Sequence, residues 1–178
     1  MNPPTEDARK GAAQEDPGET SDAAAPDSPR DALEIDTVLV PVDGSEESIR
    51  AIEYGVAVAD RYDADVHVLY VLGEDLVRAI EEEVIDQSAI AEDAQKFVEE
   101  ATAMGSSAGV ETTSSMAYGF TTQRISQHPG SVILDTAEEI DADFLVVPRE
   151  TVSEEGSEVL EKAAEYVLSY ASQPVLSV

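Results

Sequence analysis

The sequence contains no cysteine and no tryptophan, and aromatic residues make up only 5% of its 178 positions. The absence of cysteine excludes disulfide bonds, cysteine-ligated zinc and thiol chemistry. Few aromatic side chains predict a core of Val, Leu, Ile and Ala, which is feasible because 42% of the residues are hydrophobic. The chain shows no apolar run of membrane-spanning length, and its first residues lack the apolar stretch of a secretion signal. We therefore expect a cytoplasmic protein.

Basic residues are also scarce: 10 Lys and Arg stand against 39 Asp and Glu, which gives a formal net charge of -29. A negative field of this size repels nucleic-acid phosphates and anionic lipid, so we expect neither nucleic acid nor a membrane as partner. A surface rich in acid and poor in lysine suits concentrated salt, in which repulsion between like charges is screened. We therefore hypothesise a halophilic source, with an acidic protein of an ordinary cell interior as the alternative.

The first part of the chain, residues 1–34, has almost no large apolar side chain before Leu33 and is rich in Pro, Ala, Asp and Glu. Such a composition buries too little surface to offset the conformational entropy lost on folding. We predict a disordered acidic tail over residues 1–34 and one folded domain over residues 35–178.

Short apolar runs of strand length alternate with helix-length segments in that domain. The first run, TVLVPV, is typical of a strand buried on both faces, and turn and helix-cap residues follow it at once. The third run is more polar, which favours a place near a sheet edge. The predicted strands are Thr37–Val42, Val66–Leu72, Val110–Tyr118, Asp143–Pro148 and Pro174–Val178.

The segments between these strands show helical periodicity, except residues 105–109 and 119–130. Residues from about Leu76 to Met104 form one long helical stretch, whose early part is interpreted either as a separate helix or as a lid. Residues 105–109 are predicted to form a loop, and Ser131 is predicted to cap the next helix. The segment 119–130 has no clear period and carries Arg124 and His128 without an acidic residue, so we expect a small electropositive loop there. That loop is a plain insertion, or it covers the pocket, or it meets an acidic surface of a partner protein.

Strands that alternate with helices imply parallel pairing through right-handed crossovers. We therefore predict an α/β fold with three layers, a doubly wound five-stranded parallel sheet between helices. Ligands of such folds bind beyond the carboxyl ends of the strands, which here means the loops after Val42, Val71 and Val147.

The sequence offers no recognisable catalytic motif. His67 and His128 are the two histidines, and neither lies in a metal-binding spacing, so no metal site is predicted. The serines after the first strand and the run Thr112–Ser115 have no His or Lys base at a recognisable spacing. Glycine-rich dinucleotide and Walker loops are absent as well. We therefore predict no catalytic residues.

Four segments together resemble the universal stress protein family: VLVPVDGSEES, ADVHVLYV, AEEIDADFLVV and ASQPVLSV. Their order and spacing cover about Asp36 to Val178. The resemblance implies the sheet order 3-2-1-4-5 of the adenine nucleotide alpha hydrolase-like fold. It also implies a homodimer joined through the last strand, Pro174–Val178, and a role in stress response. An ordinary edge of a monomer is the alternative for that strand.

The resemblance also implies a nucleotide-binding cleft, and this sequence departs from the family pattern there. Asp43, after Pro41 and Val42, matches the acidic residue that contacts ribose or adenine, and a backbone contact falls near Val71. The family holds phosphates on a G-x-x-G-x9-G-[ST] loop, but all of its glycines are replaced here. The aligned positions hold Pro148, Thr151, Glu161 and Lys162.

Arg149 gives modest help to a phosphate, and Gly156–Ser157 is interpreted as a helix cap or as a relocated phosphate contact. We predict a noncatalytic regulatory module that acts through protein contacts, with weak or absent ATP binding and no cofactor. The alternative is an ATP- or AMP-binding switch that uses Asp43 and Gly156–Ser157.

Overall fold

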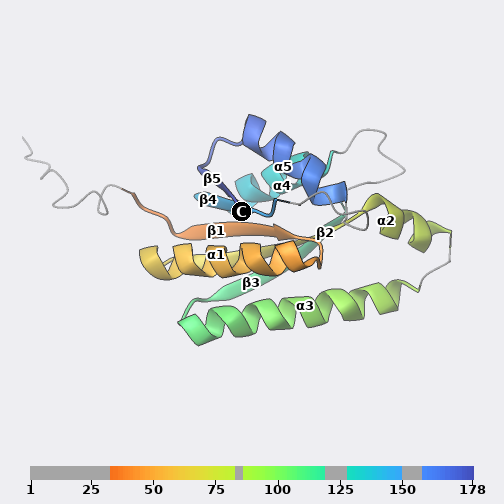
Figure 1. Cartoon of the computed structure of the whole chain (residues 1–178), viewed down its shortest axis with the longest axis horizontal. Coiled ribbons are helices and arrows are strands. Elements are labelled where there is room, and N and C mark those ends of the chain that lie inside the picture. Colours follow the sequence, from red (N-terminus) through yellow and green to blue (C-terminus); the bar gives the residue numbers. More distant parts are fainter. Residues whose placement is uncertain (1–32, 83–85, 119–127, 150–157) are drawn as a thin grey trace, which may run out of the picture. The chain divides into compact units, whose positions relative to one another are not determined.

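The computed structural model describes residues 33–82, 86–118, 128–149 and 158–178 (Figure 1). Compactness divides the chain into Met1–Ala32, which lies outside the described residues, and Leu33–Val178. The predicted disorder of residues 1–34 falls almost wholly on the undescribed part and stays a prediction.

Strands and helices alternate along the described domain in the order that the sequence predicts. The strands are β1 (Thr37–Val42), β2 (Asp65–Leu72), β3 (Thr112–Tyr118), β4 (Phe144–Val147) and β5 (Val175–Ser177). The helices are α1 (Glu46–Tyr62), α2 (Glu74–Glu81), α3 (Gln87–Ala108), α4 (Pro129–Glu139) and α5 (Glu158–Tyr170). The five strands form one sheet of order β3-β2-β1-β4-β5, and every neighbouring pair is parallel. The predicted fold class and strand order are confirmed.

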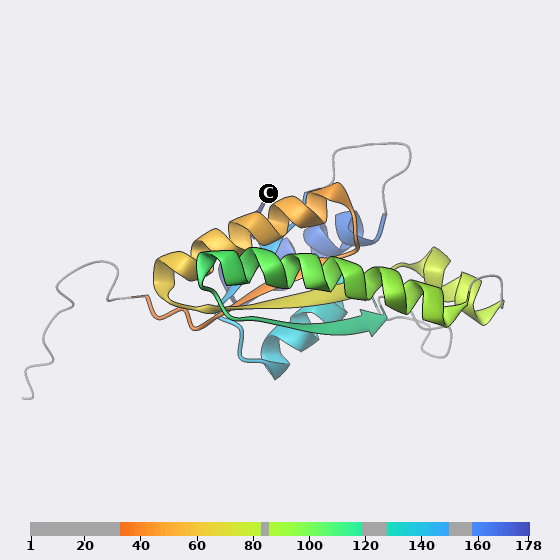
Figure 2. The same ribbon diagram turned by 90° about the horizontal axis from the view of Figure 1, so that it is seen from below.

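Helices cover both faces of the sheet, which gives the three predicted layers (Figures 1 and 2). Side chains of α1, α2 and α3 pack with one face of the central strands around Val38, Val40 and Val68. Side chains of α4 and α5 pack with the other face around Leu39, Leu69 and Val147. Because successive strand residues alternate between faces, the continuous apolar runs of β1 and β2 supply both cores.

The helix ends follow from local sequence. Ser45 caps α1 by accepting the backbone N–H of Ser48, and α1 ends at Asp63, which adopts a left-handed conformation with φ of 61°. Gly109 ends α3 in the same region, with φ of 78°. These ends use the residue types that tolerate positive φ.

The structure selects one of two open interpretations and corrects three sequence predictions. The long stretch after β2 is two helices, α2 and α3, which selects the separate-helix interpretation. Residues 105–108, predicted as a loop, continue α3, because Gly109 rather than Gly105 takes the left-handed conformation that ends the helix. Val110, predicted to open the third strand, donates its N–H to Gly105 O in that helix end, so β3 begins at Thr112.

The start of α4 is the third correction. Helix α4 begins at Pro129 with His128 as its cap, and not at Ser131. Proline is favoured at the first helical position because it has no N–H to leave unpaired. The His128 Nδ1 accepts the Gly130 N–H at 3.1 Å, and the Ser131 hydroxyl donates back to His128 O at 2.7 Å. His128, expected in a loop, is therefore a capping residue.

Candidate functional site

The candidate site lies where three parallel strands end at the same edge of the sheet. Val42 pairs with Tyr70 across β1 and β2, and Leu39 pairs with Leu145 across β1 and β4. Continuing the second register along both strands sets Pro148 opposite Val42. Asp43 therefore follows β1 at the edge where β2 and β4 also end, as the rule for doubly wound sheets requires.

Asp43 is held by hydrogen bonds at the start of α1. Its Oδ1 accepts from the Ser45 N–H at 3.0 Å and from the Ser48 hydroxyl at 2.8 Å. Its backbone N–H donates to Ser48 Oγ at 3.0 Å. Ser48 has no exposed surface, so this small polar cluster is built into the protein rather than arranged by solvent.

The other carboxylate oxygen of Asp43 has no partner. Oδ2 is buried and makes no hydrogen bond in the part of the chain that the structure describes. A buried acceptor without a donor costs free energy, about 1–3 kcal/mol in typical proteins. Such an atom fits a hydroxyl group supplied by a ligand.

Tyr70 closes the site from the side of β2. Its hydroxyl donates to the backbone carbonyl of Asp43 at 3.1 Å, and its ring meets Phe97 of α3 edge-on, with centroids 6.1 Å apart. Burial raises the pKa of the Tyr70 phenol, and the carboxylates of Asp43 and Asp93 raise that pKa further. Tyr70 is therefore a neutral donor that links the Asp43 loop to both β2 and α3.

Gly44 is required by this close approach. It has φ of 90°, and a Cβ at this position would lie 2.8 Å from the Tyr70 hydroxyl oxygen. The Asp-Gly-Ser turn thus presses its backbone against the tyrosine, which no larger residue allows without a shift.

The end of β4 offers little to an anion. Pro148 is buried and has no backbone N–H. The next N–H, that of Arg149, donates to the carbonyl of Val178 beyond β5. The Arg149 side chain is exposed. The described backbone at the first phosphate-loop position therefore does not fit a phosphate group.

The structure brings together only some of the predicted site residues. Asp43 and the ends of β1 and β4 meet at the carboxyl edge. Val71 is 1% exposed and faces α4 and α5, on the side opposite to Val42. Its side chain is thus core, although its backbone lies near the site. Gly156 and Ser157 lie outside the described residues, as does the loop segment with Arg124.

Sequence reasoning missed Ser48 and Tyr70. Ser48 lies one helical turn before Ile52 on the buried face of α1, so a polar residue within an apolar stripe was the available signal. No comparable signal in the sequence pointed to Tyr70, because it lies within the apolar run of β2 and resembles a core residue.

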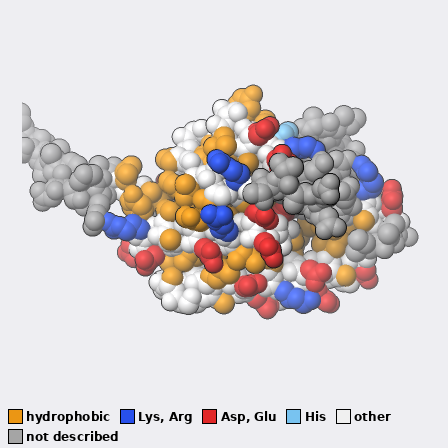
Figure 3. Space-filling model, viewed as in Figure 1, with side chains coloured by type: hydrophobic (Ala, Val, Ile, Leu, Met, Phe, Trp, Pro, Cys, Tyr) orange, Lys and Arg blue, Asp and Glu red, His pale blue; other side chains and the backbone are white. Residues whose placement is uncertain are grey.

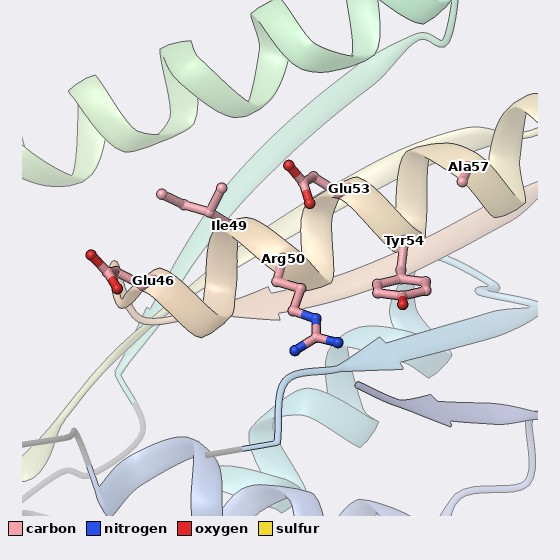
Figure 4. Close-up of a pocket in the computed structure, with 6 residues that line it drawn as sticks. All are labelled: Glu46, Ile49, Arg50, Glu53, Tyr54 and Ala57. Carbon is pink, nitrogen blue, oxygen red and sulfur yellow. The ribbon is translucent and has the colours of Figure 1, made fainter. Parts of the chain in front are cut away.

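A hollow of about 460 Å³ lies on the outer surface of α1, apart from the predicted site residues. Figure 4 shows Arg50 and Tyr54 on one side of the helix and Ile49 and Glu53 on the other. The Arg50 guanidinium lies 5.9 Å from the centre of the Tyr54 ring. The lining residues are Glu46, Ile49, Arg50, Glu53, Tyr54 and Ala57. All of them belong to α1, so this is a shallow hollow on the surface of one helix rather than a cleft between elements.

Other kinds of site find little support among the described residues. They contain no group of three or more His, Cys, Asp and Glu side chains that could hold a metal ion. The helices within the described ranges include none with the length and apolar character to cross a membrane. Figure 3 shows acidic side chains spread among hydrophobic ones over the visible face, with Lys and Arg at a few separate places.

The fold agrees with the comparison to known families. The model of the universal stress protein family matches residues 34–178, and the chain belongs to this family. A comparison with curated protein sequences gave no significant match.

Solved structures show the same architecture. A universal stress protein from Burkholderia pseudomallei is 20% identical with a TM-score of 0.58, over 82% of this chain and 96% of that chain. A universal stress protein in complex with cAMP is 21% identical with a TM-score of 0.58, over 82% of this chain and 98% of that chain. A universal stress protein from Archaeoglobus fulgidus in complex with dAMP is 20% identical with a TM-score of 0.55, over 82% and 98% of the two chains. At these identities the likeness establishes the fold.

Proposed function

We propose that this member of the universal stress protein family is a noncatalytic regulatory module that binds adenine nucleotide weakly or not at all. The observation that carries the proposal is the end of β4. Phosphates are held in such loops by free backbone N–H groups. Here Pro148 has none, and the Arg149 N–H is already paired with Val178 O.

Charge supports the same proposal. The aligned phosphate loop and the helix turn after it contain several glutamates in sequence and few cations: Glu150, Glu154, Glu155, Glu158 and Glu161 against Arg149 and Lys162. Each unpaired carboxylate within several ångströms of a triphosphate costs roughly 0.5–1 kcal/mol in water-like surroundings, and less in concentrated salt. In this sequence the five glutamates outnumber the two cations, so the balance of charge opposes a triphosphate at this loop.

The alternative is a nucleotide-binding switch centred on Asp43. The unpartnered Asp43 Oδ2 favours it, because a ribose hydroxyl would supply the missing donor. The cAMP and dAMP complexes of related proteins are consistent with it. In that case Gly156–Ser157 would supply the phosphate contact that Pro148 cannot.

Isothermal titration separates the two functions. The full chain in concentrated KCl is titrated with ATP–Mg, AMP and cAMP, and we expect no saturable heat, or binding in the millimolar range or weaker. Micromolar binding that Asp43→Ala abolishes would establish the switch instead. Glu139→Ala is the matched control, since it removes an exposed carboxylate at the last residue of α4 and leaves the site untouched.

We propose further that the module is a homodimer joined through Pro174–Val178. Strand β5 is an edge strand, and its inner hydrogen bonds alternate: Leu145 N–H donates to Pro174 O and Val178 N–H donates to Val147 O. In a regular parallel ladder, the N–H groups of Val175 and Ser177 therefore point outward and can pair with a second copy. This edge supports a dimer in which two sheets become continuous.

Sedimentation of wild type and Ser177→Pro tests the dimer. Proline at this position removes one outward N–H and spares the bonds to β4. We expect a wild-type dimer and a monomeric variant. A wild-type monomer at every concentration, or a variant that stays dimeric, would exclude this interface.

A further inference from the structure

His67 lies between two hydroxyl groups of the neighbouring strand. The register of β2 and β3 sets His67 opposite Thr113 and Leu69 opposite Ser115. Because alternate residues of a strand share a face, Thr113 and Ser115 lie on one face with His67. The imidazole Nδ1 is 2.9 Å from Thr113 Oγ1, and Nε2 is 2.7 Å from Ser115 Oγ. One ring thus spans two hydroxyls that are distant from it in sequence.

These hydrogen bonds restrict the protonation of the ring. A neutral imidazole offers one N–H donor and one lone-pair acceptor, so one hydroxyl donates to the ring while the other accepts from it. Burial lowers the pKa of His67 from its ordinary value of 6.5, which favours the neutral ring at neutral pH. With Nδ1–H donated to Thr113, the Nε2 lone pair accepts the Ser115 hydroxyl. This is the arrangement in which an imidazole acts as base toward a serine.

The two hydroxyls are open to solvent. Thr113 and Ser115 are exposed, and β3 is the edge strand of the sheet (Figure 2). The strand sequence TTSSMAY contains no charged residue, although the chain carries a net charge of -29. An uncharged reagent therefore reaches Ser115 freely, whereas an anionic reagent is repelled by the surrounding field.

We propose that Ser115 is a nucleophile that His67 activates and Thr113 positions, and that it accepts an acyl group from an uncharged thioester or ester. Ser115 is then a site of covalent modification, one acyl group per chain. This inference is independent of nucleotide binding at Asp43, because its residues lie on β2 and β3 within the sheet and share none with that site.

The acyl transfer balances without a further reactant. Ser115 Oγ attacks the carbonyl carbon of the donor while its proton passes to His67 Nε2. The new C–O ester bond forms, and the C–S or C–O bond to the leaving group breaks. The imidazolium returns its proton to the departing thiolate or alkoxide, which leaves O-acyl-Ser115, a free thiol or alcohol and a neutral His67.

The test uses the full chain and S-acetyl-N-acetylcysteamine, an uncharged thioester, with acetyl phosphate as the anionic comparison. Peptide mass spectrometry locates the acetyl group, and hydroxylamine removes a serine ester but not an amide on lysine. We expect one hydroxylamine-labile acetyl group on Ser115, formed faster from the thioester. Concentrated salt should reduce the difference in acetylation rate between the two donors, because it screens the repulsion of acetyl phosphate.

Variants separate activation from simple exposure. Ser115→Ala should abolish labelling, and His67→Gln should slow it by about 100-fold or more, the typical contribution of a general base. Ser114→Ala is the matched control, since Ser114 is an exposed neighbour on the other face of the strand, and it should label at the wild-type rate. Circular dichroism confirms that each variant is folded.

Nitrogen NMR of His67 tests the positioning by Thr113 separately. We expect the Nδ1–H tautomer in wild type, and a mixture of tautomers with slower labelling in Thr113→Val. Labelling of Ser114 and Ser115 at equal rates would overturn the proposal, as would an unchanged rate in folded His67→Gln. Absence of any labile acetyl group on Ser115 would overturn it too.

Discussion

Ser48 illustrates how much of this site depends on one buried hydroxyl. Its oxygen donates to Asp43 Oδ1, accepts the Asp43 N–H and lies 3.1 Å from Ser45 Oγ. All of these partners belong to the turn between β1 and α1. Ser48 therefore makes two of the hydrogen bonds that hold Asp43 in place.

Replacing Ser48 with alanine should destabilise the protein by about 1–3 kcal/mol, because the Asp43 N–H and carboxylate lose a buried partner. Chemical denaturation of wild type and Ser48→Ala measures this difference. Ser106→Ala is the control: Ser106 is exposed within α3, and its replacement should leave stability unchanged or slightly higher. Equal stability of both variants would mean that the cluster is dispensable.

His67 makes stability depend on pH. Burial lowers the pKa of its ring in the folded protein below 6.5, the ordinary value that applies to the unfolded chain. Between these two pKa values the unfolded state binds more protons, so the His67 contribution is complete above 6.5 and is lost as the pH falls toward the folded pKa.

We therefore expect wild type to lose more stability than His67→Gln between about pH 7.5 and pH 5. Thermal melts of both proteins across this range measure the difference, and carboxylate effects cancel because both proteins share them. Parallel curves would show that the ring titrates alike in the folded and unfolded states.

At the scale of secondary-structure elements, the contact between α4 and α5 has almost no spare room. A Cβ added at Gly130 would lie 2.6 Å from the Cβ of Tyr166 on α5. The Tyr166 ring in turn stacks on His128, the cap of α4, with centroids 4.6 Å apart. The start of α4 and the face of α5 are therefore positioned together.

Gly130→Ala should lower the free energy of unfolding by about 1–3 kcal/mol, because the first turn of α4 and the Tyr166 side chain must move apart to make room for the methyl group. Gly109→Ala supplies the comparison: its Cβ would meet nothing within 4 Å, and the left-handed φ of 78° alone should cost about 1–2 kcal/mol. Chemical denaturation measures both, and near-UV circular dichroism should change for Gly130→Ala only. An unperturbed tyrosine signal in that variant would contradict the close contact.

The elements differ in how far their sequence determines them. Strands β1 and β2 were predicted to within a residue, because a continuous apolar run buried on both faces has one interpretation. The start of α4 was misplaced, since His128 is a less common cap than the serine near it. The end of α3 was misplaced because two glycines, Gly105 and Gly109, offered alternative stops. The folded backbone selects between them: Gly109 takes the left-handed conformation, and Gly105 packs closely against Thr112.

The candidate sites show the same division. The position of Asp43 at the carboxyl edge of the sheet was predictable, because its place after the first strand follows from chain order. The pairing of His67 with Ser115 was not, because it depends on the register of β2 against β3, and shifting that register by one residue would send these side chains to opposite faces. The position of a residue in a turn next to a strand is thus easier to predict than a contact between side chains on two paired strands.

Net charge dominates the behaviour of the whole molecule. The described carboxylates lie mostly on the surface, and the ion pair between Lys96 and Asp93 is itself exposed, so it offsets little of the total of -29. Self-repulsion of this size opposes compact structure unless dissolved ions screen it.

We expect the melting temperature to rise from low salt to multi-molar KCl, where the screening length falls to about 3 Å or less. Melts at increasing KCl measure this. Sucrose at matched osmolality is the control, because it favours compact states by exclusion without screening charge. Equal melting temperatures at all KCl concentrations would contradict the halophilic hypothesis.

Tyr70 gives the protein an optical reporter. Intrinsic fluorescence comes from tyrosine alone, since the chain has no tryptophan among its 178 residues. The phenol of Tyr70 is tied to the Asp43 carbonyl, so its absorbance and emission respond to any movement of that turn. Near-ultraviolet difference spectra, with Tyr70→Phe as the blank, would follow movement of the Asp43 turn without a label.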